Sequence, residues 1–153
     1  MMGVELPLVS AIIARTANPE PSLAALSSLI YPIALMVEAP IIMLLAASTA
    51  LCTDWASYQK LRRFTHVSGL LLTLLHVVIA FTPLYDLIAE SVVNVHPSVV
   101  EPGRVGLQIM TPWTWAIASR RFQQGVLIRF ERSRAVVEGT LVRLITVALV
   151  LTV

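Results

Sequence analysis

The feature that most constrains this chain is a run of 33 residues, from Pro21 to Thr53, in which Glu38 is the only charged side chain. A helix needs about 20 apolar residues to cross the hydrocarbon core of a bilayer, which is about 30 Å thick. A surface helix of a soluble protein needs a polar face, and this run does not supply one over its whole length. The pattern therefore predicts a membrane-spanning helix, which we place near Leu26 to Leu51.

The composition of the whole chain supports this interpretation. Its 153 residues are 57% hydrophobic and 13% charged, whereas soluble domains have about 25% charged residues. So few charged side chains do not cover the surface of a soluble globule, which leaves a soluble enzyme as a distant alternative. The high hydrophobicity also excludes intrinsic disorder.

Three further apolar segments predict three further spans. Phe64 to Tyr85 contains no Asp, Glu, Lys or Arg, a third segment runs from Val105 to Ile128 and is broken near Pro112, and a fourth runs from Ala135 to Val153. Each approaches or exceeds the length of about 20 residues that a spanning helix needs. We predict an all-α fold, a polytopic transmembrane helical bundle with about four full helices and a partial N-terminal one. Residues 1–153 then form a single transmembrane domain.

The partial segment is Val4 to Ala14, which is followed by the helix-stopping run Asn18 to Pro21. Eleven residues are too few to span a bilayer. The segment is expected to be either the last part of a helix whose beginning precedes this sequence or an interfacial helix.

The charges between these segments predict the topology. Stretches 54–63 and 129–134 are basic, and stretch 86–104 carries three acidic residues and one Arg. Loops rich in Lys and Arg remain in the cytoplasm. We therefore expect an integral protein of the bacterial inner (plasma) membrane, with 54–63 and 129–134 in the cytoplasm and 86–104 outside.

Several functional classes lack any supporting motif. The single cysteine, Cys52, forms no internal disulfide, and no Cys/His cluster suggests a metal. The basic residues gather in short stretches instead of one face, which argues against nucleic-acid binding. No phosphate-binding loop, nucleophile elbow or metalloprotease motif is present. We expect no catalytic residues, no metal, no cofactor and no enzymatic activity.

The histidines likewise do not indicate a metal site. His66 and His76 are ten residues apart on one predicted helix and do not share a face. We expect His66 at headgroup level and His76 as a packed, hydrogen-bonded core residue.

The charged residues within the apolar segments are the candidate site. Glu38 lies between Pro32 and Pro40, with Tyr31 on nearly the same helical face. A charge at the bilayer centre is costly, and such residues usually face a bundle interior or an aqueous cavity. The functional hypothesis is a protonatable or ion-linked carboxylate beside a distorted helix. The alternative is a carboxylate neutralised by a structural partner.

A second set of candidates lies in the last two segments. Arg120, Arg121 and Arg143 are within the predicted membrane region, and Gln108 adds a polar group near Pro112. Guanidinium groups match carboxylates and phosphates, so these residues predict a cavity for an anionic or amphipathic solute. The alternative is that they form structural ion pairs or extend to the headgroups.

The order of these features resembles a transporter family. The motifs that carry the resemblance are Asn18-Pro19, Leu23-Ala24-Ala25-Leu26, Glu38-Ala39-Pro40, Ala46 to Leu51, Gly106 to Trp113, Arg120 to Ile128 and Arg132-Ser133-Arg134. They are similar to the first five helices of the multidrug and toxin extrusion (MATE) family, within the multidrug/oligosaccharidyl-lipid/polysaccharide exporter superfamily. The bacterial relatives of the progressive-ankylosis transporters are the most similar branch.

The resemblance implies a secondary active exporter with two helical bundles and alternating access. This chain would be an N-terminal fragment comprising most of the first bundle, with the lipid bilayer, a small-molecule solute and the remaining half of the transporter, or other membrane helices, as partners. The acidic helix-one residue that some members use for ion coupling has no counterpart here. The alternative is a small four-helix membrane subunit or assembly factor that acts by binding other proteins.

Overall fold

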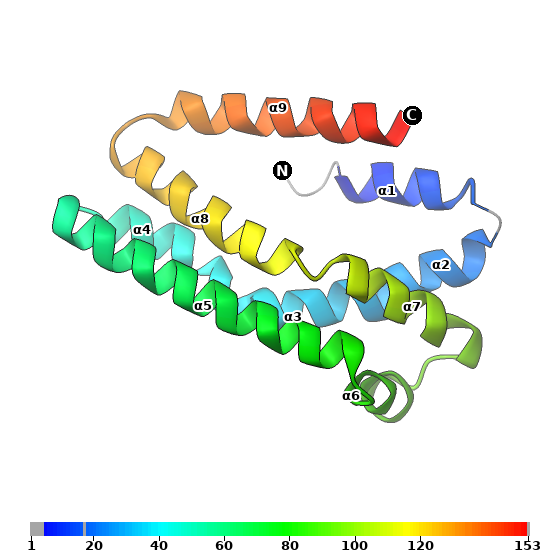
Figure 1. Ribbon diagram of the computed structural model, residues 1–153. Helices are drawn as coiled ribbons and strands as arrows, with labels where there is room; N and C mark the ends of the chain where they lie inside the picture. The colour runs from blue at the N-terminus through cyan, green and yellow to red at the C-terminus, as the bar shows by residue number, and fades with distance from the viewer. Residues whose placement is uncertain (1–4, 17, 153) are drawn as a thin grey trace.

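The computed structural model describes residues 5–16 and 18–152. Every regular element in these residues is a helix, which confirms the all-α prediction (Figure 1). Val4 and Val153, at the outer ends of two predicted segments, lie outside the described residues. Within them, the partial segment forms α1 (Glu5–Ile13) and the fourth predicted segment forms α9 (Ser133–Thr152).

The long apolar run forms one 33-residue helix from Pro19 to Leu51. It comprises α2 (Pro19–Ala25), a π-helical turn η1 (Leu26–Ile30), α3 (Tyr31–Ile42) and α4 (Leu44–Leu51). It begins at Pro19, earlier than the predicted Leu26. Proline is favourable in the first turn because the backbone N–H groups there have no helical partner. The run from Asn18 to Pro21 therefore begins this helix as well as following α1.

The second long helix, α5 (Trp55–Phe81), also begins earlier than predicted, so most of the basic stretch 54–63 is helical and not a loop. The reason is a capping box. The Asp54 carboxylate accepts a hydrogen bond from the Ser57 backbone N–H at 2.7 Å, and the Ser57 hydroxyl oxygen accepts one from the Asp54 N–H at 3.0 Å. The Ser57 backbone N–H and hydroxyl both donate to the Asp54 carboxylate, and these two bonds hold the pKa of Asp54 below its usual value. At the other end α5 stops at Phe81 because Pro83 follows closely.

The predicted outer loop 86–104 is also largely helical. It contains the end of α6 (Leu84–Asp86), a π-helical segment η2 (Leu87–Val93) and the first part of α7 (Pro97–Ile109). Tyr85 is fully buried here, and its hydroxyl donates to the Val100 carbonyl at 2.7 Å. Arg104 forms an ion pair with Asp86 and lies over the Tyr85 ring, 5.0 Å from its centroid. These contacts hold α6 against α7.

The third predicted segment is two helices, α7 and α8 (Trp113–Arg129), instead of one. The chain leaves the helical path between Met110 and Pro112, so the break expected near Pro112 is confirmed. A proline has no N–H to donate and excludes the preceding residue from ideal helical geometry. This break lies beside Glu38.

The long helix, α5 and the α7–α8 pair form the packed body of the molecule, and α9 runs back along α8 toward α1 (Figure 1). Two buried apolar clusters fill it. One contains Leu29, Val37, Tyr85 and Leu107, and the other contains Ile41, Leu44, Ile117 and Ala118. Glu38 lies in sequence between the parts of α3 that enter these clusters.

Gly125 allows α4 and α8 to approach closely. A Cβ atom at Gly125 of α8 would lie 2.0 Å from the Ser48 hydroxyl oxygen and 2.6 Å from the Leu45 carbonyl oxygen of α4. The Thr49 hydroxyl also donates to the Gly125 carbonyl at 3.3 Å. Small residues allow this close approach in membrane helices, where packing and interhelical hydrogen bonds drive association.

Two helices, Pro19–Leu51 and α5, are long and apolar enough to cross a membrane. On α5, a row of large apolar side chains is exposed, namely Phe64, Val67, Leu70, Leu71, Leu74, Leu75 and Val78. Exposed apolar area of this extent is unusual on soluble monomers. The basic ends, at the α4–α5 and α8–α9 connections, lie at one end of the molecule, and the acidic α6–α7 region lies at the other (Figure 1).

Candidate functional site

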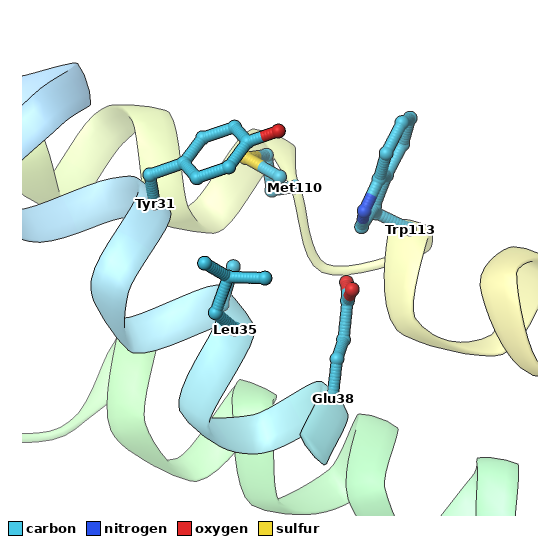
Figure 2. Close-up of a pocket in the computed structure, with 6 residues that line it drawn as sticks. Tyr31, Leu35, Glu38, Met110 and Trp113 are labelled. Carbon is cyan, nitrogen blue, oxygen red and sulfur yellow. The ribbon is translucent and has the colours of Figure 1, made fainter. Parts of the chain in front are cut away.

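Glu38 is a buried carboxylate in the middle of the long helix, with 3% of its surface exposed. It lies beside the break between α7 and α8. A cavity of about 20 Å³ adjoins it, with walls that include Tyr31, Leu35, Met110 and Trp113. Figure 2 shows the carboxylate directed at the indole nitrogen of Trp113, with Tyr31 and Met110 on the neighbouring wall. This space is enough for about one water molecule.

The surroundings of Glu38 satisfy the hydrogen-bonding capacity of its carboxylate only in part. The Trp113 indole N–H faces the carboxylate, and the Arg121 guanidinium attracts the carboxylate electrostatically. Its Oε1 atom has no hydrogen-bond partner in the described part of the chain. A buried carboxylate with an unsatisfied oxygen next to a water-sized space is able to hold a proton or an ordered water.

The arginines gather at a second, larger hollow. Arg120 and Arg121 of α8 and Arg143 of α9 line one cavity of about 360 Å³. Volumes of about 300–1,000 Å³ are typical of small-molecule sites. The remaining walls come from α4, α8 and α9, namely Leu45, Gln124, Ile128, Val136 and Thr140. The side chains that line it within the described residues include no carboxylate.

The guanidinium groups of Arg120 and Arg121 retain hydrogen-bonding capacity. The buried Nε atoms of Arg120 and Arg121 have no partner within residues 5–16 and 18–152. Guanidinium forks bind carboxylates and phosphates with paired hydrogen bonds. Gln124 and Thr140 add neutral polar groups to the same walls. The arrangement is chemically suited to an anion.

The six predicted site residues thus lie at three separate locations. Tyr31 and Glu38 share the small cavity, and the three arginines share the large one. Arg121 connects the two electrostatically, through its attraction to Glu38. Gln108 is separate, because its amide nitrogen donates to the Ala80 carbonyl at 3.3 Å and joins α7 to the end of α5.

His76 is confirmed as a packed, hydrogen-bonded core residue. It is fully buried, with Nε2 at 3.0 Å from the Leu107 carbonyl oxygen and Nδ1 at 3.0 Å from the Thr114 hydroxyl. A carbonyl only accepts, so Nε2 carries the proton, and in the neutral ring Nδ1 accepts from Thr114. One side chain of α5 therefore holds both sides of the break between α7 and α8.

Other residues complete these cavities and are not among the predicted site residues. They include Trp113 beside Glu38 and Thr140 of α9 beside the arginines. The preference of Trp for partly polar surroundings was a general signal, but its pairing with Glu38 depends on how the broken helix packs. Gln124 lies on the wall of the arginine cavity, and the packing of α8 against α9 places it with Arg143.

No group of three or more His, Cys, Asp or Glu side chains in the described part of the chain is placed to hold a metal ion. Comparisons with family models, with curated proteins and with solved structures found no match.

Proposed function

We propose that this chain is an integral membrane protein and forms part of a secondary active exporter for an anionic or amphipathic solute. The observation that carries the proposal is the convergence of three guanidinium groups on one cavity of about 360 Å³ between α8 and α9. Intramembrane ionisable residues that face a cavity usually mark a substrate or ion pathway.

The proposed membrane arrangement includes more than the two helices that, among the described residues, are long and apolar enough to span. In it, the α7–α8 pair and α9 also cross the bilayer, which gives about four spans with α1 as a partial fifth. A helix broken at Pro112 is acceptable inside a membrane only where neighbouring groups satisfy its backbone, and His76 does so for the Leu107 carbonyl. The basic ends are proposed to lie in the cytoplasm of a bacterial inner membrane.

In this proposal the arginines bind the solute, and rocking of the bundle exposes the cavity to one side of the membrane at a time. Glu38 competes with the anion for Arg121, because both are attracted to the same guanidinium. The proposed relation to MATE-like exporters rests on the order of motifs in the sequence. Under this proposed relation, the chain forms most of one helical bundle. Its partners are the remaining half of the transporter or other membrane helices.

We expect Arg121→Ala to reduce anion flux by about tenfold or more, because a charge-assisted hydrogen bond contributes about 1.5–3 kcal/mol. Glu38→Gln removes the competing charge and should strengthen anion binding while altering flux. The assay measures carboxyfluorescein and inorganic phosphate flux in proteoliposomes that contain the protein as its gene encodes it.

Arg63→Ala is the matched control, since Arg63 is exposed on α5 and lines neither cavity. Flux that is unchanged in both Arg121→Ala and Glu38→Gln would refute the assignment of these residues to a transport site.

A further inference from the structure

A third hollow, on the other side of α8, is distinct from the cavities described above. It lies between α5 and α8 near the basic end of the molecule and has a volume of about 280 Å³. Its walls are mainly polar, namely Tyr58, Arg62, Thr65, His66, Ser119 and Gln123, with Phe122 as the apolar member. The proposed transport site uses none of these side chains.

Thr65 indicates that this hollow takes a polar ligand. Its side chain is 1% exposed, and its hydroxyl has no hydrogen-bond partner in the described residues. A buried hydroxyl without a partner costs free energy. Arg62 and His66 precede and follow Thr65 on α5 and line the same hollow. A hydroxyl, a guanidinium and an imidazole within one hollow form a donor set suited to a phosphate group.

In the membrane arrangement proposed above, this hollow lies at the level of lipid headgroups. Trp55 and Tyr58 stack at 5.2 Å between ring centroids, and Tyr58 contacts Phe122 at 5.5 Å. Trp and Tyr are enriched where a membrane protein meets the headgroup region. Basic residues near the cytoplasmic surface also attract anionic lipids. The exposed apolar row of α5 continues from this level toward the opposite end of the helix.

We propose that this hollow binds the phosphate group of an anionic phospholipid, with Arg62 as the charged contact and Thr65 and His66 as hydrogen-bonding contacts. The inference depends on insertion of the chain in a membrane and not on transport. A failed flux experiment would therefore leave it standing, and a failed lipid experiment would leave the transport proposal standing.

The test compares Arg62→Gln with Arg63→Gln. Both substitutions remove one positive charge from adjacent exposed positions on α5, but only Arg62 lines the hollow. Purified protein is titrated with phosphatidylglycerol or phosphatidylcholine in detergent, and bound lipid is counted by native mass spectrometry. We expect wild type to prefer phosphatidylglycerol, Arg62→Gln to weaken its binding by about tenfold, and Arg63→Gln to weaken it less than about twofold.

A parallel titration with inorganic phosphate distinguishes the two sources of the ligand group. Displacement of phosphatidylglycerol by millimolar phosphate would support the same phosphate site with free phosphate as a second ligand. Equal losses in the two variants would show that the attraction is diffuse surface charge, and that result would overturn the proposal. The absence of any preference of the wild type for phosphatidylglycerol, with no phosphate binding, would overturn it as well.

Discussion

Replacement of Gly125 by Ala is expected to destabilise the protein, whereas replacement of Gly139 by Ala is not. At Gly125 the new Cβ atom would lie 2.6 Å from the Leu45 carbonyl oxygen, which belongs to backbone and does not rotate away. Overpacking of this kind costs about 1–3 kcal/mol. At Gly139 nothing lies within 4 Å of the added atom, so only the helix propensity changes, by up to about 1 kcal/mol in favour of Ala.

The measurement is the denaturation midpoint of each variant in detergent, followed by tryptophan fluorescence. Gly125→Leu should have a larger effect than Gly125→Ala, because its side chain forces α4 and α8 apart. Adding Ser48→Ala to Gly125→Ala should give only partial recovery, since it removes the clash with the hydroxyl and leaves the carbonyl in place. Equal stabilities of Gly125→Ala and Gly139→Ala would show that α4 and α8 do not approach as described.

The second large effect is expected at His76. His76→Leu removes both hydrogen bonds of the ring and leaves the Thr114 hydroxyl and the Leu107 carbonyl without their partner. An unsatisfied buried group costs about 1–3 kcal/mol, so two such groups predict a loss of about 2–6 kcal/mol. The loss should be concentrated where α7 meets α8, because His76 contacts both.

A double-mutant cycle with Thr114→Val isolates one of these bonds. Single interhelical hydrogen bonds in membrane proteins contribute about 0.6–1.7 kcal/mol, which is the coupling energy we expect for the pair. Thr73→Val is the control, since the Thr73 hydroxyl donates only within its own helix, to the Gly69 carbonyl at 2.8 Å. A coupling energy near zero would contradict the assigned network.

The helical class was predictable from the sequence because hydropathy indicates it. The hydrogen-bonded role of His76 was predictable because His66, ten residues away, does not share its helical face. The helix boundaries were less predictable. The capping box of Asp54 and Ser57 begins α5 before the basic residues. The stretch that was expected to be a loop is therefore mostly helical. The prolines at 19 and 21 begin a helix where they were expected mainly to end one, since proline is compatible with both positions.

The cavities were predictable only in part. Arg120 and Arg121 are adjacent in sequence, but their convergence with Arg143 depends on how α9 returns along α8. Gln108 precedes Arg120 by twelve residues, which is about 18 Å along even a continuous helix, so the two side chains lie apart. Packing between distant segments decides such positions, and a hydropathy pattern contains little information about it.

In the proposed transport site, Arg120, Arg121 and Arg143 create a water-accessible cavity that favours anions. A single reporter thiol tests it directly. Cys52 is the only cysteine and is fully buried, so Cys52→Ser gives a background for Gln124→Cys on the cavity wall. In membrane vesicles, this thiol is reacted with an anionic and with a cationic methanethiosulfonate reagent. Each rate is divided by the rate of the same reagent with a free thiol in solution.

We predict that the anionic reagent is favoured, and that adding Arg121→Gln reduces this preference. A thiol that reacts with neither reagent, or one that favours the cationic reagent, would contradict the account.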